Sequence, residues 1–205
     1  ILCANNSNQK KLLDFSIKPQ IIRIIFLLLV GSAFYVVYSQ LILAKESRQT
    51  KLALDSLEKG NILEAENFLL PLRESQKNSI SFCITYGNLL YAQNKYAESL
   101  EQFICAKKFS SNPELYDMAA KCQFNLKNKE ETISNLYQAS ALSPKTMRYK
   151  FGLMQLLFTS NRIKEACKIA QKIVLMEPKN PDEQTNKYQN KAQQLLNHCQ
   201  LGYAN

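Results

Sequence analysis

The chain has 205 residues, of which 26 are Lys or Arg and 17 are Asp or Glu, so its formal charge is +9. Its length suits one compact domain, or a smaller domain with an anchor, and excludes two large catalytic domains. Apolar residues make up 46% of the chain, with only five Gly and six Pro, which excludes collagen-like and disordered proteins. The basic excess is spread along the sequence, which indicates solvated helix faces rather than a surface that binds nucleic acid.

The first predicted element is an apolar helix. Residues 24–44 are 21 consecutive positions without a charged side chain, and a helix needs about 20 apolar residues to cross a bilayer. We therefore expect a juxtamembrane segment at residues 1–20 and a transmembrane helix at residues 21–44. The alternative, a buried core helix, needs a larger protein around it. A cleaved signal peptide fits poorly, because its apolar run is shorter and begins earlier.

The charges around this helix leave its orientation open, because basic residues flank both ends and the positive-inside rule gives no bias. They are Lys10, Lys11, Lys18 and Arg23 before the helix, and Lys45, Arg48, Lys51 and Lys59 after it. The sequence begins with Ile1 rather than Met, from which we expect a fragment or a processed product of a longer chain.

A repeat of 33 to 34 residues follows the apolar helix. Small residues recur in one register, and a second set recurs twelve positions before them. The first set is Ala65, Ser99, Thr132 and Ala166, and the second is Ala53, Gly87, Ala120 and Met154. Both sets lie in amphipathic segments, so each unit is predicted to be a pair of helices that pack closely through these positions.

Prolines mark the ends of helices in this pattern. The pairs Asn112-Pro113, Ser143-Pro144 and Glu177-Pro178 follow the last three units. We expect Asn112 and Ser143 to cap helices that begin with the following proline. Pro71 lies inside the second helix of the first unit, which it is predicted to kink.

At these residues the sequence resembles the tetratricopeptide repeat (TPR) family, whose 34-residue unit is a helix pair with small residues at positions 8 and 20. Departures include Met154 at position 8 of the last unit and the absence of Trp at position 4. The resemblance implies an all-α fold, in which one transmembrane helix precedes an α-α superhelix of about four TPR units and a C-terminal capping helix. The expected TPR domain is residues 45–180, with units at about 46–79, 80–112, 113–146 and 147–180, and the capping helix and tail are residues 181–205.

The TPR resemblance also implies a binding groove, because the first helix of each unit lines the concave surface of a TPR array. The family's ligand-contacting positions fall here on Asn88, Tyr91, Asp117, Lys121, Phe124, Arg148, Phe151, Gln155 and Phe158. Aromatic residues supply contact area at low entropic cost, and the polar residues can pair with a peptide backbone or an acidic group. The alternative is that Tyr91, Phe124 and Phe158 pack between adjacent helices.

Motifs for catalysis are missing from the sequence. There is one histidine, His198, the six cysteines contain no CxxC pair, and no phosphate-binding or metalloprotease motif occurs. We therefore expect a chain that is not an enzyme by itself and holds no metal or cofactor. Four cysteines within the predicted repeat helices are expected to be free thiols that fill small apolar spaces, which favours the cytoplasmic side of the membrane. They are Cys83, Cys105, Cys122 and Cys167.

These features predict a membrane-anchored TPR module, in a bacterial inner membrane, that binds a protein or peptide and no nucleic acid. Two alternatives stay open. An apolar span, a unit reading YGNLLYAQNKYAESLEQF and a last unit reading RYKFGLMQLLFTSNRIKEACKIAQKIVLMEPK are similar to the C-terminal tail of bacterial O-antigen ligase or polymerase proteins. This resemblance covers residues 21–200 and implies that glycosyl transfer is carried by upstream segments. The other alternative is an anchored adaptor of a secretion or envelope-assembly complex.

Overall fold

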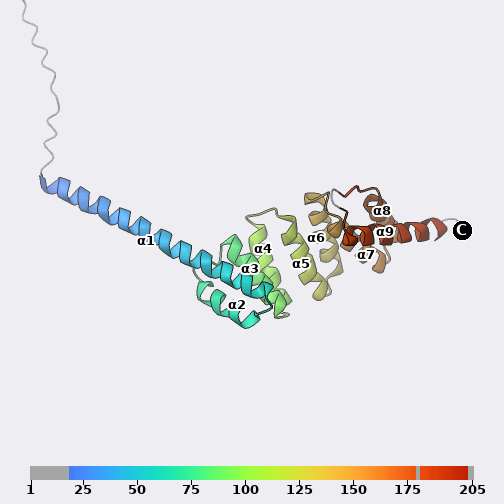
Figure 1. The fold of residues 1–205 in the computed structure, drawn as a ribbon, viewed down its shortest axis with the longest axis horizontal. Coiled ribbons are helices and arrows are strands. Elements are labelled where there is room, and N and C mark those ends of the chain that lie inside the picture. Colours follow the sequence, from blue (N-terminus) through green and yellow to red (C-terminus); the bar gives the residue numbers. More distant parts are fainter. Residues whose placement is uncertain (1–18, 179–180, 203–205) are drawn as a thin grey trace, which may run out of the picture. The chain divides into compact units, whose positions relative to one another are not determined.

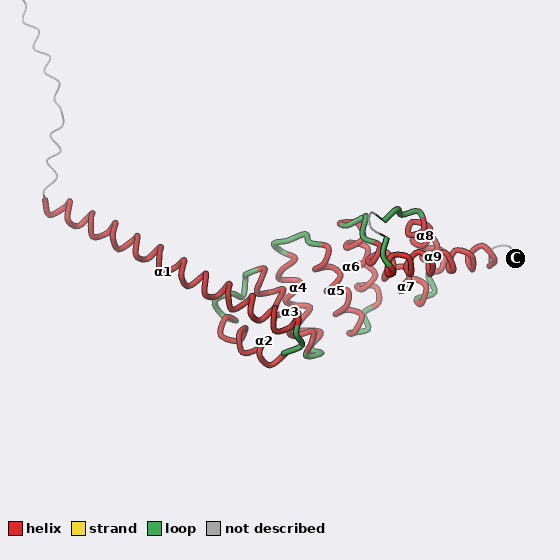
Figure 2. Tube along the Cα trace, in the orientation of Figure 1, coloured by secondary structure: helices red, strands yellow, loops and turns green. Residues whose placement is uncertain are grey.

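The computed structural model describes residues 19–178 and 181–202, and all regular secondary structure within them is helical (Figures 1 and 2). The helices are α1 (Pro19–Glu58), α2 (Ile62–Leu69), a 3-10 turn η1 (Leu70–Leu72), α3 (Ile80–Ala92), α4 (Tyr96–Lys107), α5 (Pro113–Asn125), α6 (Lys129–Leu142), α7 (Met147–Thr159), α8 (Ile163–Val174) and α9 (Glu183–Gly202). The all-α prediction is confirmed.

The chain divides into two compact units, residues 1–45 and residues 46–205. In the first unit, α1 presents exposed apolar side chains from Ile21 to Leu43, and this stretch is long and apolar enough to cross a membrane. Most of the predicted juxtamembrane segment, residues 1–18, lies outside the described residues, and Pro19 already belongs to α1. The helix does not end near residue 44 but continues to Glu58, because residues 45–59 contain no Gly or Pro.

The second unit is a linear array of helix pairs. Each helix from α3 to α8 packs on its neighbours in sequence, and α9 packs on α7 and α8. The small positions of the repeat are buried at these contacts, as the pattern predicts: Ala53, Ala65, Ser99 and Ala166 have no exposed surface. Larger side chains such as Phe82, Phe103 and Leu153 fill the spaces between pairs and are also fully buried. Nearest-neighbour packing of this kind is typical of a solenoid.

The same backbone turn joins the two helices of every pair. Gly60, Asn94, Lys127 and Asn161 all have a left-handed backbone, with φ between 59° and 79°. In each turn the residue after this position donates its N–H to the carbonyl five residues earlier, as Lys95 does to Leu90 at 2.9 Å. This is the Schellman motif, which ends a helix and favours Gly or Asn at its left-handed position. The turns recur at 34, 33 and 34 residues.

The proline prediction is confirmed at Asn112 and wrong at Ser143, and at Pro71 the structure has the end of a helix where a kink was expected. Asn112 caps α5, because its side chain accepts the N–H of Glu114 at 3.0 Å and Pro113 begins the helix. Pro71 ends α2, which gives way to the turn η1. Ser143 does not cap the next helix: it follows the C-terminus of α6, and α7 begins only at Met147. Its hydroxyl instead contacts that of Thr146 at 2.7 Å.

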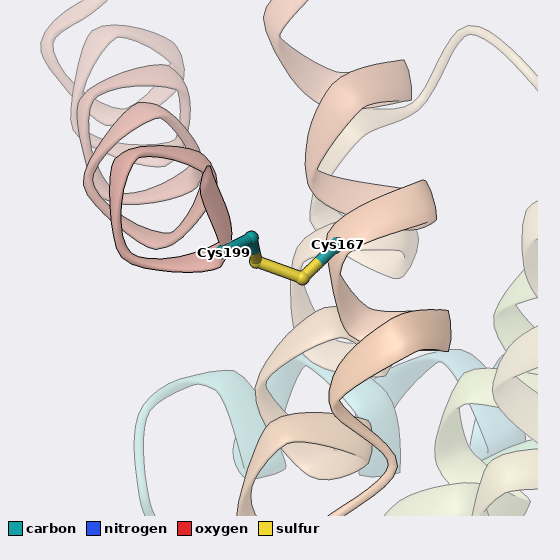
Figure 3. Close-up of a disulfide and its surroundings, with 2 residues drawn as sticks. All are labelled: Cys167 and Cys199. Carbon is teal, nitrogen blue, oxygen red and sulfur yellow. A yellow bond between two sulfur atoms is a disulfide. The ribbon is translucent and has the colours of Figure 1, made fainter. Parts of the chain in front are cut away.

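A disulfide joins the last two helices (Figure 3). Cys167 of α8 is bonded to Cys199 of α9, with a Cα–Cα distance of 6.5 Å. The prediction that Cys167 is a free thiol was therefore wrong. The reason is that α9 packs along α8, which brings together two cysteines that are 32 residues apart in sequence.

Candidate functional site

A groove of about 590 Å³ runs along the helix array. Its walls come mainly from α5 and α7, with Tyr91 of α3 and Tyr188 of α9 contributing to the lining. Seven of the predicted site residues line it: Tyr91, Asp117, Lys121, Phe124, Arg148, Phe151 and Gln155. Phe158 lines a neighbouring hollow of about 320 Å³, which Phe151 and Gln155 also line. Asn88 is half-buried and lines neither hollow.

The backbone turns set where the aromatic side chains project. Three aromatic residues lie in the last turn of the first helix of their pair: Tyr91, Phe124 and Phe158. The backbone carbonyl of each accepts the N–H of the left-handed residue three positions later, at 3.0 to 3.1 Å. The Schellman turn therefore fixes the end of the helix immediately beside each ring. Asn125 links α5 to α3 by a hydrogen bond, because its Nδ2 donates to Tyr91 Oη at 3.3 Å. The same Nδ2 also donates to the Lys121 carbonyl at 2.8 Å.

The aromatic residues differ in how far they are exposed. Phe124 is 62% exposed and Phe158 is 40% exposed, so neither side chain is buried between adjacent helices. Phe151 is only 9% exposed and packs on Tyr188, with ring centroids 4.4 Å apart. Phe151 thus belongs largely to the core beneath the groove, whereas Phe124 presents apolar surface to whatever enters it.

The polar part of the groove surrounds a buried acid. Asp117 is 6% exposed, and its Oδ2 lies 3.1 Å from Lys121 Nζ and 3.6 Å from Arg148 Nη2. Neither contact has hydrogen-bond geometry, so Oδ2 accepts no hydrogen bond in the described structure. Arg148 also pairs with Glu114 at 3.6 Å. Glu114 does not line the groove, so its charged lining residues are Asp117, Lys121 and Arg148, with one positive charge in excess.

Arg148 stays protonated in this setting. Partial burial disfavours its charge, but a hydrogen bond to Tyr149 and the charges of Asp117 and Glu114 outweigh that effect and raise the pKa of Arg148. Its side chain is 48% exposed, and that of Lys121 is 47% exposed. Both cations can therefore donate to a ligand's carbonyl or carboxylate oxygens while Asp117 holds them in place.

Comparison with solved structures identifies the architecture. The structure of YrrB, described as a TPR protein with an unusual peptide-binding site, has a TM-score of 0.57, 16% identity, and coverage of 72% of this chain and 84% of that one. MamA matches with a TM-score of 0.57 at 12% identity, over 75% of this chain and 88% of its own. Yeast Tom70 matches with a TM-score of 0.62 at 15% identity, over 76% of this chain and 34% of its own.

The described helices have the TPR fold. No protein-family model matches the sequence, and no curated protein matches it. With identities of 12–16%, the likeness to these structures shows the fold alone.

Sequence reasoning missed several residues that line the groove of this TPR array. Tyr188 and Gln184 come from α9, which the sequence analysis treated only as a cap, and Asn125 and Thr159 follow the predicted ring positions by one residue. The sequence did contain one indication that Tyr188 contacts the repeats, because Tyr188 is the only Phe, Tyr or Trp between positions 181 and 200. An aromatic ring in so polar a helix is expected to pack on an apolar partner.

The structure also shows where the other candidate chemical groups lie. His198 lines the smaller hollow together with Phe158 and Lys191. Among residues 19–178 and 181–202, no group of three or more His, Cys, Asp or Glu side chains is arranged to hold a metal ion.

Proposed function

We propose that this TPR array binds an extended segment of a protein partner in its groove, and that the apolar part of α1 anchors it in a bilayer. The exposure of Phe124 carries the proposal: a phenylalanine 62% exposed at the edge of a 590 Å³ groove is available as an anchor for a ligand side chain. Lys121 and Arg148 lie in the same groove and supply donors for the backbone of an extended segment. YrrB, of the same fold, is described as having a peptide-binding site.

Site-specific photocrosslinking tests the groove. A photoreactive phenylalanine analogue at position 124 should give a crosslinked adduct in cells, and the same analogue at position 109 should not. Phe109 is a matched control, because it is 57% exposed but lies outside both hollows. Equal adducts at the two positions, or none at position 124, would contradict groove binding.

Alanine substitution gives the second test. The double variant Phe124→Ala, Phe158→Ala should lose the adduct formed by an analogue placed at Gln155, with helicity and melting temperature close to those of the wild type. Phe109→Ala should keep the adduct. Truncation of a fully buried Phe costs about 3–5 kcal/mol, so a loss of that size in the double variant would show that the two rings belong to the core.

Membrane anchoring is tested by introducing charge. Leu28 is 68% exposed within the apolar part of α1, and Leu175 is 74% exposed after α8. An Arg at the centre of a bilayer-spanning helix costs about 2.5–3.5 kcal/mol on insertion scales. Leu28→Arg should therefore reduce the membrane-bound fraction, while Leu175→Arg leaves it unchanged. Release of the wild-type chain from membranes by alkaline carbonate would exclude a spanning helix.

The second proposed function is the C-terminal tail of a polytopic O-antigen ligase or polymerase, in a bacterial inner membrane. The order of an apolar span followed directly by repeats supports it, since α1 runs without a break from the apolar stretch to Glu58. An antibody to the repeats distinguishes the two proposals by intact mass in membranes. A species near 23.5 kDa indicates a single-span scaffold, and one about two to three times larger indicates a tail. Copurification with a translocation complex would favour an adaptor.

A further inference from the structure

Two further cysteines lie against each other in the α3–α4 pair. Sγ of Cys83 in α3 is 2.9 Å from Sγ of Cys105 in α4. Both sulfurs also face the carbonyl oxygen of Lys77, at 3.3 Å from Cys83 and 3.5 Å from Cys105. A disulfide bond is about 2.0 Å long, so the sulfurs have only about 1 Å to close. The two helices are packed neighbours, as are the helices that carry Cys167 and Cys199.

We propose that Cys83 and Cys105 form a second disulfide, and that the repeat domain therefore faces an oxidising compartment. The oxidant is a disulfide, carried by a thiol–disulfide exchange protein or by a small thiol. As the new S–S bond forms, the two thiols lose two protons and two electrons. The electrons cleave the oxidant's S–S bond, and its two sulfurs take up the protons and leave as thiols. This proposal does not depend on the proposed groove function.

The surroundings of the pair set the order of the exchange. Cys105 is half-buried and lines a hollow of about 210 Å³ together with Arg73 and Lys77, whereas Cys83 is fully buried. An oxidant therefore reaches Cys105, whose sulfur forms the mixed disulfide and displaces the oxidant's first thiol. Cys83 then attacks Sγ of Cys105 from its adjacent position and displaces the second thiol.

The state of Cys105 affects the pKa of Cys83. Burial, the hydrogen bond with Cys105 and the charge of Cys105 together raise the pKa of Cys83 to about 12. In the mixed disulfide Cys105 carries no charge, so that cause disappears and the pKa of Cys83 falls, while burial still raises it. Reaction of Cys105 thus makes the thiolate of Cys83 easier to form, which favours closure of this pair.

Cys122 provides an internal control. It is fully buried, and its sulfur lies 3.3 Å from the hydroxyl of Ser99 rather than beside another sulfur. Burial also raises the pKa of its thiol. Cys122 should therefore remain a thiol under conditions in which Cys83 and Cys105 are oxidised.

The two cysteine pairs remove the argument from free thiols that favoured a cytoplasmic repeat domain. That expectation rested on four free thiols in the repeats, but Cys167 is bonded to Cys199, and Cys83 and Cys105 are in contact. Disulfides persist in oxidising compartments and are rare in the cytosol. Two bonded pairs in one small domain place it on the oxidising side of the membrane.

Mapping of disulfides in the full chain tests the proposal. Cells expressing the protein are quenched in acid, the chain is alkylated under denaturing conditions before any reduction, and its peptides are analysed by mass. We expect linked peptides for Cys83–Cys105 and Cys167–Cys199, each about 2 Da lighter than the sum of the two thiol peptides, and alkylated Cys122. Alkylated Cys83 and Cys105 would overturn the proposal, whether or not Cys167–Cys199 is linked in the same sample.

Variants and purified protein give an independent reading. Cys105→Ser should make Cys83 reactive towards the alkylating agent after denaturation, while Cys122→Ser should leave both links intact. The purified wild-type chain in detergent, reduced and then treated with oxidised glutathione, should regain the Cys83–Cys105 link. Its melting temperature should rise on the order of 5–10 °C when the link closes. A link from Cys122 to either residue, or persistent glutathione adducts on Cys105, would contradict the proposed pair.

Discussion

Two glycines in first helices of the repeat should respond to alanine in opposite directions. Gly152 in α7 has room for a methyl group, because an added Cβ would lie 3.8 Å and 3.9 Å from the Leu136 side chain. Gly87 in α3 does not, since an added Cβ would lie 3.0 Å and 3.1 Å from the ring of Phe103 and 3.2 Å from Cβ of Gln102. Phe103 is fully buried, and both neighbours belong to α4, so relief would require α3 and α4 to separate.

The expected magnitudes follow from these contacts. Alanine is favoured over glycine inside a helix by about 1 kcal/mol, so Gly152→Ala should stabilise the domain by about that amount. At Gly87 the same gain is opposed by overpacking, which costs about 1–3 kcal/mol. Gly87→Ala should therefore leave the domain about 0–2 kcal/mol less stable than the wild type. The two variants should differ by about 1–3 kcal/mol.

Urea unfolding of the full chain in detergent micelles, followed by circular dichroism, measures both variants under the same conditions. The apolar part of α1 remains helical in the micelle and contributes a constant signal. A Gly87→Ala variant as stable as Gly152→Ala would refute the reasoning, because it would mean that the ring of Phe103 can yield to the methyl group without cost.

Three further predictions concern other features of the array. Asn112→Ala should lower stability by about 1 kcal/mol, through loss of the α5 cap, whereas Ser79→Ala at the uncapped start of α3 should change it by less than about 0.5 kcal/mol, both by urea unfolding. Lys127→Gly should raise the free energy of unfolding by about 0.5–1 kcal/mol, because glycine adopts its left-handed backbone without strain. A hydrogen bond from Arg162 lowers the pKa of Glu165 from its ordinary value of 4.5, so this pair favours the folded state above that pH and the contribution is lost as the pH falls through the lowered value. Arg162→Gln should therefore lose less stability than the wild type between about pH 6 and pH 3, and an unchanged acid dependence would contradict the role of the pair.

The repeat was predictable from sequence because its small positions lie at helix contacts. Ala65 and Ser99 must be small for the helices to approach, and that steric demand is visible as a period in the chain. The groove positions on α5 and α7 follow from the same register, so Phe124 and Arg148 could be placed on one face. Whether these residues bind a partner stays a prediction.

Features that depend on packing between distant segments were not predictable. The Cys167–Cys199 bond and the contact of Tyr188 with Phe151 both require α9 to lie against α7 and α8. The repeat of 33 to 34 residues, from which the helix pairs were predicted, ends before α9. Ser143 was misplaced for a local reason: a Ser-Pro pair predicts a helix start, but the hydroxyl of Ser143 contacts Thr146 and the helix begins after it.

The recurrent left-handed turns have a consequence for how such proteins diverge. Each turn is specified by backbone hydrogen bonds and by one position that prefers a residue without a bulky Cβ, so it makes few demands on the side chains around it. Outside the turns and the buried small positions, many sequences are therefore compatible with the spacing of 34, 33 and 34 residues. This fits the finding that solved structures share the fold at 12–16% identity while no family model matches. The third turn, which has Lys127 at its left-handed position, shows that even this position tolerates a residue other than Gly or Asn.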